Sequence, residues 1–395
     1  MQDKRKMAKK REEKSIHMKK ILIVACYSRF VVQFELNNAH ILQNMGYEVH
    51  YACNYEQEDM YSLARQTLED NNIVLHQIDF VRSPYKLIDN TKAYNQLKAL
   101  MTRQHFDGVH CHTPMAGLLA RMAAKATNTK PVIYTAHGFH FYKGCPLKNK
   151  LIYETAERYM AKYTDALITI NKEDFEAAQN FKLRGKAYYI PGVGVDVNAI
   201  SNLQVDRTSK RQELGIATED FVVISVGELN SNKNQKIIVQ ALANIDLETI
   251  HYIICGKGSY ESKLKEQVTA LHLESKVHFV GFREDAKELL KISDAFVFPS
   301  FREGLSVAIM EAMAAGLPCI VSNIRGNVDL IDEGKGGYLC DPQSSDDFAN
   351  VIKKLESNRQ SGIKMGQYNM EKIKLFDVSK VTALMEKIYS EQVNR

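Results

Sequence analysis

From Met18 onward, short apolar runs alternate with stretches whose apolar residues recur at helical spacing, and this alternation constrains the fold more than any other feature. It predicts a parallel sheet covered by helices, because each connection between parallel strands needs a crossover element. In the first half of the chain we expect helices over 31–45, ending at Gly46, and over 86–104. We expect strands over residues 21–26, 48–53, 73–78, 108–112, 132–136, 166–170 and 187–190.

The alternation lapses between residues 191 and 206, a stretch with Gly192, Gly194 and several polar residues, and then restarts. Strands of the second half are expected over residues 221–226, 251–255, 277–282, 295–299 and 319–322. Because 395 residues exceed what one hydrophobic core usually serves, we expect two α/β parallel-sheet domains. They would span residues 18–190 and 207–375, with a linker over 191–206. A last helix within 376–395 could cap the second domain or cross back to the first.

The formal net charge of +5 is unevenly distributed, since residues 1–17 contain seven Lys or Arg and three acidic residues. Residues 18–395 therefore carry only +1, which argues against a nucleic acid as partner. We interpret residues 1–17 as a disordered, solvated basic extension, with contact to anionic lipid as the alternative.

Neither the leading segment nor any later run contains the apolar stretch of a secretory signal or of a membrane span. The seven cysteines are scattered and include no CxxC pair, which is typical of free thiols in a reducing compartment. We therefore expect a cytoplasmic protein.

Two carboxylates stand out in the segment FPSFREGLSVAIMEAMAAG. Glu303 and Gly304 follow an expected strand, and ligands bind beyond the carboxyl ends of strands in such sheets. Ser306 is a good N-cap for the next helix, whose positive start suits a phosphate. Glu311 is the only charged residue of that helix, so burial would require partners for its carboxylate. These could be the two hydroxyls of a ribose, with Glu303 binding a second sugar, or a cation such as Arg325.

A lysine follows the first strand of the second half, in the segment VGELNSNKNQK. Gly227 lets the backbone approach a ligand closely. Lys233, near a helix start, could neutralise a diphosphate, or it could be an ordinary surface lysine. The turn over 256–258 is only weakly glycine-rich, and GxGxxG with an acidic partner is absent. Hydride transfer with a dinucleotide has little support, and we expect no cofactor.

Several histidines lie at strand ends of the first half. His137 follows the strand expected over 132–136 and could hydrogen-bond a sugar, or it could be a satisfied loop histidine. The neighbouring His110, Cys111, His112 and His140 raise a metal site as an alternative. Their spacing matches no recognised zinc pattern, and we expect no metal.

Glu303 and Glu311, with seven residues between them, match the Glu-x7-Glu motif of retaining glycosyltransferases of family 4. From residue 18 almost to the end, the chain resembles this family. The segments HCHTPMAGLLARMAAKA, YTAHGFHFYKG and VGELNSNKNQK resemble exopolysaccharide and capsule enzymes of the EpsD type. The resemblance implies the GT-B architecture, in which two Rossmann-like domains face each other across a cleft.

The resemblance also implies a role for each matching residue. Lys233 would contact the diphosphate of a nucleotide-sugar donor, Glu311 its ribose and His137 the reacting sugar. Glu303 would bind the donor sugar, so that His137, Glu303 and Lys233 form the catalytic set. The backbone positions implied are Gly227 beside the phosphates, Gly304, Leu305 and Ser306 at the sugar, and Gly281 and Phe282 at the base. The leaving phosphate oxygen would itself deprotonate the acceptor.

The chain departs from the family pattern in two places. Glu228 stands where many members have an arginine that pairs with the diphosphate, and Arg283 or Lys257 could replace it. After the first strand, the residues Tyr-Ser-Arg-Phe over 27–30 replace a common glycine pair. Phosphate and acceptor contacts should therefore differ from the usual ones.

We expect a hexosyl- or N-acetylhexosaminyltransferase that uses a nucleotide-sugar. The resemblance implies UDP as the nucleotide, a lipid-linked or saccharide acceptor, and a role in exopolysaccharide, capsule or lipopolysaccharide synthesis. It also implies peripheral association with the cytoplasmic membrane face. One alternative is a sugar-nucleotide 2-epimerase of the same architecture, which needs an acid and a base at the second carbon of the sugar. The other is a non-catalytic homologue that binds sugar nucleotides as a scaffold, which Glu228 would favour.

Overall fold

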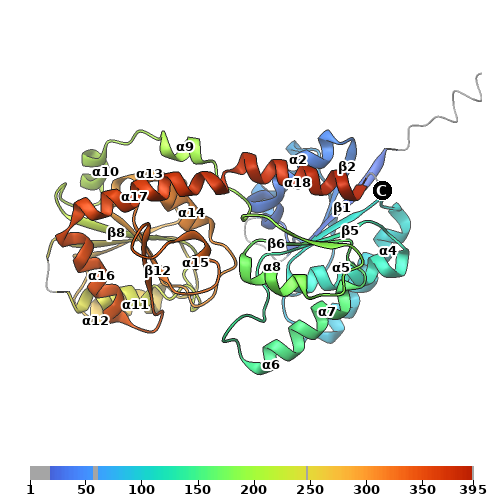
Figure 1. The fold of residues 1–395 in the computed structure, drawn as a ribbon, viewed down its shortest axis with the longest axis horizontal. Helices are drawn as coiled ribbons and strands as arrows, with labels where there is room; N and C mark the ends of the chain where they lie inside the picture. The colour runs from blue at the N-terminus through green and yellow to red at the C-terminus, as the bar shows by residue number, and fades with distance from the viewer. Residues whose placement is uncertain (1–17, 57–60, 246–247, 394–395) are drawn as a thin grey trace, which may run out of the picture.

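Two parallel sheets, one in each half of the chain, form the framework of the molecule (Figure 1). The computed structural model describes residues 18–56, 61–245 and 248–393, so the basic extension expected over 1–17 lies outside the described residues. Within the described part, the first sheet has seven strands in the order β3-β2-β1-β4-β5-β6-β7 and the second has six in the order β10-β9-β8-β11-β12-β13. The strand order reverses between β1 and β4 and between β8 and β11, which is where ligands bind in such sheets.

The first domain contains β1 to β7. Its strands are β1 (Lys19–Tyr27), β2 (Tyr47–Asn54), β3 (Val74–Gln77), β4 (Val109–His112), β5 (Val132–Ala136), β6 (Ala166–Thr169) and β7 (Lys186–Tyr189). Its helices are η1 (Val31–Glu35), α2 (Leu36–Asn44), α3 (Tyr61–Asp70), α4 (Leu87–Gln104), α5 (Pro114–Thr127), α6 (Leu147–Asn149), η2 (Lys150–Glu154), α7 (Thr155–Ala161) and α8 (Lys172–Gln179).

The second domain contains β8 to β13. Its strands are β8 (Phe221–Val226), β9 (Ile250–Cys255), β10 (Val277–Gly281), β11 (Ala295–Phe298), β12 (Cys319–Ser322) and β13 (Gly337–Cys340). Its helices are α9 (Val197–Ser201), α10 (Arg207–Glu213), α11 (Lys236–Ala243), α12 (Glu261–Ala270), α13 (Ala286–Ile292), α14 (Val307–Ala314), α15 (Asn327–Leu330), α16 (Ser345–Ser357), α17 (Arg359–Ile373) and η3 (Lys374–Phe376).

The expectation of two parallel sheets is confirmed, and the expected strands agree with the observed ones to within about two residues at each end. Central strands such as β1 are apolar and buried on both faces, because helices cover both sides of each sheet. Two features differ from expectation. β13 was not expected, since its sequence is short and begins with glycine. The helix expected over 31–45 is divided into the π-helix η1 and the α-helix α2.

The chain crosses between the domains twice, and the two crossings are hydrogen-bonded to each other. The backbone N–H of Val195 donates to Phe376 at 3.1 Å, and that of Val378 donates to Val195 at 3.0 Å. The last helix, α18 (Val378–Val393), then lies against α2 of the first domain, as Figure 1 shows at the upper edge. Its Tyr389 hydroxyl is 2.8 Å from Nδ1 of His110 on β4. The final helix therefore crosses back to the first domain.

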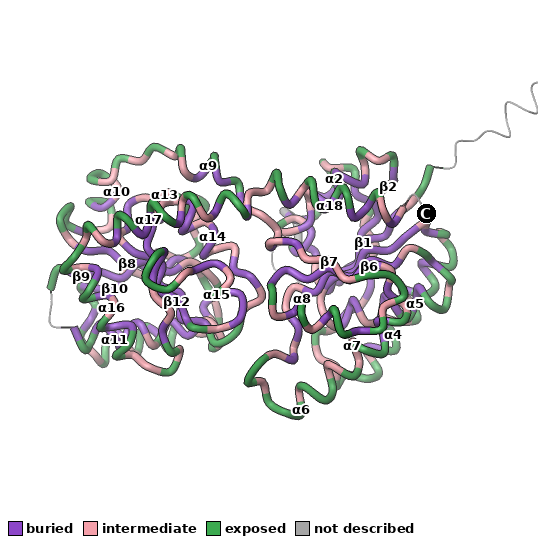
Figure 2. Tube along the Cα trace, viewed as in Figure 1, coloured by how far each residue is buried: buried purple, intermediate pink, exposed green. Residues whose placement is uncertain are grey.

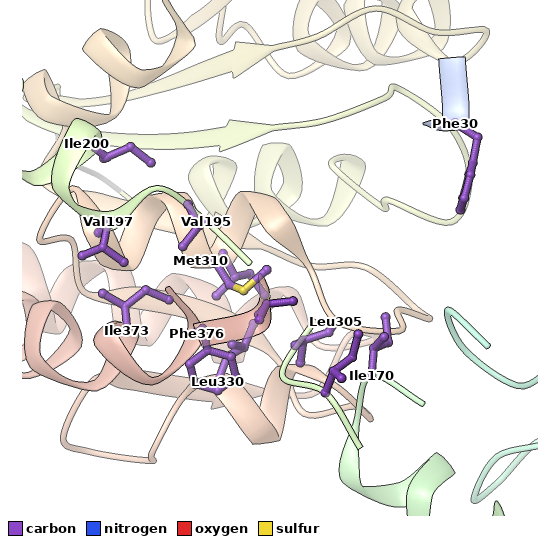
Figure 3. Packing of buried hydrophobic residues seen from close by; sticks show 14 of the residues in the cluster. Phe30, Ile170, Val195, Val197, Ile200, Leu305, Met310, Leu330, Ile373 and Phe376 are labelled. Atoms are coloured by element: carbon purple, nitrogen blue, oxygen red, sulfur yellow. The ribbon is translucent and has the colours of Figure 1, made fainter. Parts of the chain in front are cut away.

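Buried residues run through both sheets (Figure 2), and one cluster of buried apolar residues has members in both domains. Figure 3 shows this continuity, with Ile170 from the end of β6 next to Leu305 from the segment before α14. All seven cysteines are free thiols. None of the described helices combines the length and the apolar character that a bilayer-spanning helix requires.

Candidate functional site at the domain contact

The two domains touch through two glycines at strand ends. Gly304, after β11, lies so close to the first domain that a Cβ atom there would be 1.8 Å from the carbonyl oxygen of His137. Gly138 has a φ of +143°, and a Cβ atom there would be 3.2 Å from Gly304 Cα. Any side chain at Gly304 would push the domains apart, and a side chain at Gly138 would be strained by its backbone conformation. The contact therefore brings the loop after β5 against the loop after β11.

Arg325 holds this contact together. Its guanidinium donates to Asp174 Oδ1 at 2.8 Å and to the carbonyl of Phe139 at 2.9 Å, both in the first domain. It also donates to the carbonyl of Glu303 at 3.2 and 3.3 Å. Burial raises the pKa of Asp174, and the charge of Arg325 opposes that shift. Arg325 thus pairs with Asp174 and not with Glu311, whose nearby cation is Lys287.

Lys233 and Glu303 lie side by side, as expected for residues that follow the neighbouring strands β8 and β11. Lys233 Nζ donates to Glu303 Oε1 at 2.8 Å, with side-chain exposures of 21% and 14%. The loop that carries Lys233 is fixed by Asn230, whose side-chain oxygen accepts from the Lys233 backbone N–H at 3.0 Å. Glu303 lines a cleft of about 410 Å³ together with Tyr142 and Arg302. In the absence of a ligand, each of the two charges therefore has the other as its partner.

Helix α14 begins beside this pair. The Ser306 side chain caps it by accepting from the Ile309 backbone N–H at 3.4 Å, and the Leu305 side chain is buried. Glu311 lies one turn further on, mostly buried, with Lys287 Nζ 3.9 Å away. Burial raises the pKa of Glu311, and Lys287 partly offsets that shift. The carboxylate therefore has a single distant cation as its charged partner among the described residues.

The glycines after β8 and β10 bring backbone and lysines together. Gly227 has a φ of +153°, and a Cβ atom there would be 3.9 Å from Lys233 Cε. Gly281 has a φ of +69°, and a Cβ atom there would be 3.5 Å from Lys257 Cε. The next residue, Phe282, is 63% exposed. Gly227 thus lies beside Lys233, and Gly281 lies beside Lys257.

Arg283 and Lys257, the two cations considered as substitutes for an arginine at position 228, differ in whether they have a carboxylate partner. Glu228 itself is exposed. Arg283 donates twice to Asp285, at 2.6 Å each, so its guanidinium already has a carboxylate partner. Among the described residues, Lys257 has no carboxylate within ion-pair distance. Of the two cations considered as substitutes for an arginine at this position, Lys257 is therefore the one without a competing partner.

His137 lies over a buried acid that sequence reasoning missed. Its Nε2 is 3.1 Å from His112 Nδ1 and 3.6 Å from Glu35 Oε1. Burial lowers the pKa of His137 to about 4 and raises that of Glu35 to about 8. Both groups are therefore neutral near pH 7. Glu35 ends the π-helix η1, and such irregular turns are frequent at functional sites.

The same cluster has the composition of a metal site, since side-chain atoms of Glu35, His110 and His112 lie within 4.8 Å of one another. Hydrogen bonds already engage two of these residues. His110 has Tyr389 Oη and Thr135 Oγ1 at 2.8 Å from its two nitrogens. Glu35 Oε2 accepts from the Asn38 side chain at 2.5 Å. His112 Nδ1 lies beside His137, whereas the buried Nε2 of His112 has no hydrogen-bond partner among the described residues.

Comparison with known proteins identifies the family. Residues 206–372 match the family "Glycosyl transferases group 1", and residues 20–171 match "Glycosyl transferase 4-like". The putative glycosyltransferase EpsD of Bacillus subtilis is 34% identical over 94% of this chain and 96% of its own length. The chain belongs to the glycosyltransferases. The resemblance to family 4 and its EpsD-type members is thereby confirmed, and the protein is an enzyme.

A further glycosyltransferase shares the sequence, and solved structures share the fold. An Escherichia coli protein named UDP-Gal:alpha-D-GlcNAc-diphosphoundecaprenol alpha-1,3-galactosyltransferase is 31% identical over 78% of this chain and 81% of its own length. The crystal structure of Anabaena HepE in complex with UDP-glucose has a TM-score of 0.77 and 21% identity, covering 94% of this chain and 99% of that one. The lipopolysaccharide glycosyltransferase WaaG has a TM-score of 0.70 and 16% identity, covering 93% of this chain and 99% of that one. The fold of this glycosyltransferase is GT-B.

Proposed function

We propose that this glycosyltransferase transfers a hexosyl or N-acetylhexosaminyl group from a UDP-sugar to a lipid-linked or saccharide acceptor, with retention of the anomeric configuration. The product would enter exopolysaccharide, capsule or lipopolysaccharide synthesis. The relatives that support this assignment are a protein of the exopolysaccharide type and a galactosyltransferase whose name specifies a UDP-sugar and a diphosphoundecaprenol acceptor.

The observation that carries the proposal is the ion pair between Lys233 and Glu303 at the domain contact. Each of these charges can exchange its partner for part of a nucleotide-sugar. A diphosphate would accept hydrogen bonds from the Lys233 ammonium group, and the hydroxyls of a sugar would donate to Glu303. Because the pair is neutral overall and partly exposed, the unliganded site pays little for holding both charges.

The remaining contacts to the donor are part of the same proposal. Glu311 has a nearby cation only at 3.9 Å, so a ribose diol can supply the donors that its carboxylate lacks. The backbone of Gly304, Leu305 and Ser306 at the start of α14 would meet the sugar, and Gly281 and Phe282 the base. Lys257 and Gly227 would lie at the phosphates, with Lys257 in place of an arginine at position 228.

His137 would contact the transferred sugar from the first domain. Its imidazole is neutral near pH 7, so it serves as a hydrogen-bond partner and not as a cation. In the retaining mechanism we propose, the leaving phosphate oxygen accepts the acceptor proton on the same face of the sugar. Lys233 and the positive start of α14 would stabilise the charge that develops on the diphosphate. We place this reaction in the cytoplasm, with the protein peripherally associated with the membrane.

The test is turnover with a panel of labelled nucleotide-sugars and a membrane lipid extract. We expect label in the lipid fraction for one UDP-sugar, and loss of that label for Lys233→Ala and Glu303→Gln. The matched control is Lys265→Ala, which removes one partner of an exposed ion pair with Glu261. NMR of the product should show the anomeric configuration of the donor.

Two outcomes would refute the proposal. Conversion of the UDP-sugar without any acceptor would identify a 2-epimerase. Binding of UDP-sugars with no turnover under any acceptor condition would identify a scaffold. Full transfer by both Lys233→Ala and Glu303→Gln would overturn the assignment of the site while leaving the reaction intact.

A further inference from the structure

A second cleft lies on the first-domain side of Arg302 and is not explained by the donor contacts above. It has a volume of about 360 Å³, and its walls come from both domains. The first domain supplies Arg82, Thr113, Pro114, His140 and Tyr153, and the second supplies Arg302. Arg302 also lines the cleft beside Glu303, so the two clefts meet at this side chain.

The second cleft is strongly cationic. Its described lining residues include two arginines and no carboxylate. Neither Arg82 nor Arg302 has a carboxylate within ion-pair distance among the residues that the structure describes. Arg82 lies instead over the ring of Tyr27, 4.5 Å from its centroid. Two guanidinium groups without carboxylate partners, both lining one open cleft, form a site for an anion with several oxygens.

Two further groups contribute to the wall of the cleft. Helix α5 begins at Pro114 in the wall, so its positive end faces the same space. His140 is neutral near pH 7, because burial and then the charges of Arg302 and Arg325 lower its pKa to about 4. Its imidazole is thus held as a hydrogen-bonding group beside the two arginines.

The segments that line this cleft continue into exposed apolar residues. After Pro84, Leu87 and Ile88 are 72% and 86% exposed. On the other side, Tyr153 is preceded by Leu147 on α6 and Leu151 on η2, which are 83% and 73% exposed. Helix α6 lies at the lower edge of the first domain in Figure 1. Exposed apolar side chains beside a cationic pocket match a ligand with a charged head and a hydrocarbon tail.

We propose that this second cleft binds the diphosphate of the acceptor, between Arg82 and Arg302, and that the acceptor is a saccharide joined through that diphosphate to an isoprenoid or alkyl chain. The inference rests on the proposed function and specifies its acceptor site. Arg302 is shared by the two clefts, so an acceptor bound here has its sugar end beside the Glu303 cleft. The hydrocarbon chain leaves past Leu87, Ile88, Leu147 and Leu151.

The experiment uses farnesyl diphosphate below its micelle concentration as the probe, with the purified full-length protein saturated with UDP so that the donor site is filled. Binding is measured by calorimetry for the wild type, Arg82→Gln, Arg302→Gln and the control Arg103→Gln. Arg103 is exposed at the opposite end of α4, and the structure gives it no part in the cleft. We expect affinity to fall about tenfold or more in Arg82→Gln and in Arg302→Gln, and to stay unchanged in Arg103→Gln.

Two more probes test the contributions of the diphosphate and of the hydrocarbon tail separately. Farnesol should bind at least tenfold more weakly than farnesyl diphosphate, and inorganic pyrophosphate should bind but with lower affinity, since it lacks the tail. Equal affinity of wild type and Arg82→Gln for farnesyl diphosphate would overturn the proposal, as would equal affinity of farnesol. Affinity for UDP, measured separately, should be the same in wild type and Arg82→Gln. A protein that fails to bind UDP refutes the proposed function, whereas loss of the arginine dependence alone refutes only this acceptor site.

Discussion

Arg325 reaches from the second domain into the first, where its guanidinium donates to Asp174 Oδ1 at 2.8 Å with both side chains almost completely buried. The same guanidinium donates to the carbonyl of Glu303. A single side chain thus links closure of the domains to the position of the loop that carries the candidate sugar-binding carboxylate.

The first prediction concerns this buried pair. Arg325→Met leaves the Asp174 carboxylate buried without its cation, and we expect the free energy of unfolding to fall by about 3–5 kcal/mol. The double variant Arg325→Met with Asp174→Asn should recover part of that loss, because the uncompensated charge is gone. The measurement is urea unfolding followed by circular dichroism, since the chain contains no tryptophan. A double variant that is less stable than both single variants would contradict this account of the pair.

The second prediction concerns the closest approach of the domains. Gly304→Ala places a methyl group 1.8 Å from the carbonyl oxygen of His137, so the contact must open. We expect each domain to stay folded while transfer activity falls about 100-fold or more, because a displacement of about 1 Å at a reacting centre has that effect. Small-angle scattering should show a larger radius of gyration.

The control for this variant is Gly362→Ala on α17, where the added methyl group would meet its nearest neighbour at an ordinary 3.5 Å. It should leave both activity and the radius of gyration unchanged. An active Gly304→Ala protein with the wild-type radius would show that the domain contact described here is not the functional one.

The third prediction separates activity from stability at the Lys233–Glu303 pair. Because the pair is partly exposed, Lys233→Ala or Glu303→Gln should change the free energy of unfolding by about 1 kcal/mol or less. Transfer should nevertheless fall about 100- to 1,000-fold, since each removes a group that would stabilise the transition state. Parallel measurement of the free energy of unfolding and of kcat tests both the small change in stability and the large loss of transfer. A large stability loss with little change in kcat would make the pair structural.

The fourth prediction concerns the buried carboxyl of Glu35. Its pKa is raised from 4.5 to about 8 in the folded protein, so between these values the folded state holds a proton that the unfolded chain has released. Stability from this group is therefore greatest at low pH and declines as pH rises toward 8. Glu35→Gln removes that decline. Relative to the wild type it should gain stability steadily from pH 5 to pH 8, by a few kcal/mol in total.

The histidines around Glu35 change the stability with pH in the opposite direction. Burial lowers the pKa values of His110, His112 and His137, so these residues cost stability as pH falls below about 6.5. Comparing the variant with the wild type at each pH cancels their contribution, and the raised pKa of Tyr389 keeps its hydroxyl neutral over this range. Thermal unfolding at several pH values is the measurement. The exposed Glu266→Gln is the control, and a pH-independent difference for Glu35→Gln would contradict the prediction.

The sequence predicted most of the sheet framework, because buried parallel strands are uninterrupted apolar runs and few other structures use them. β13 was missed since Gly337-Tyr-Leu-Cys340 is too short to stand out. The split of the first helix at Glu35 was also missed, because helical periodicity does not distinguish a π turn from an α turn over so few residues.

Residues of the candidate site could be predicted where a local sequence pattern marks them. Their partners could not be predicted where only the tertiary structure brings them together. Glu311 was found because it is a lone carboxylate in an apolar helical run. Glu35, in FVVQFELNNAHIL, carries the same signal and could have been found in the same way. The partnership of Arg325 with Asp174 joins residues 151 positions apart in different domains, which no local pattern reveals. The roles of these residues in catalysis stay predictions until the variants are measured.

The two domain crossings are joined by hydrogen bonds at Val195, Phe376 and Val378, with Gly194 packed tightly against Val378. A body attached at two points that are fixed to each other can turn about the line through them, but it cannot easily slide or twist. We therefore expect this enzyme to open and close by a hinge motion about a single axis. Each closure would then bring Gly304 back to the same position against Gly138. The two domains would regain their alignment directly after product release.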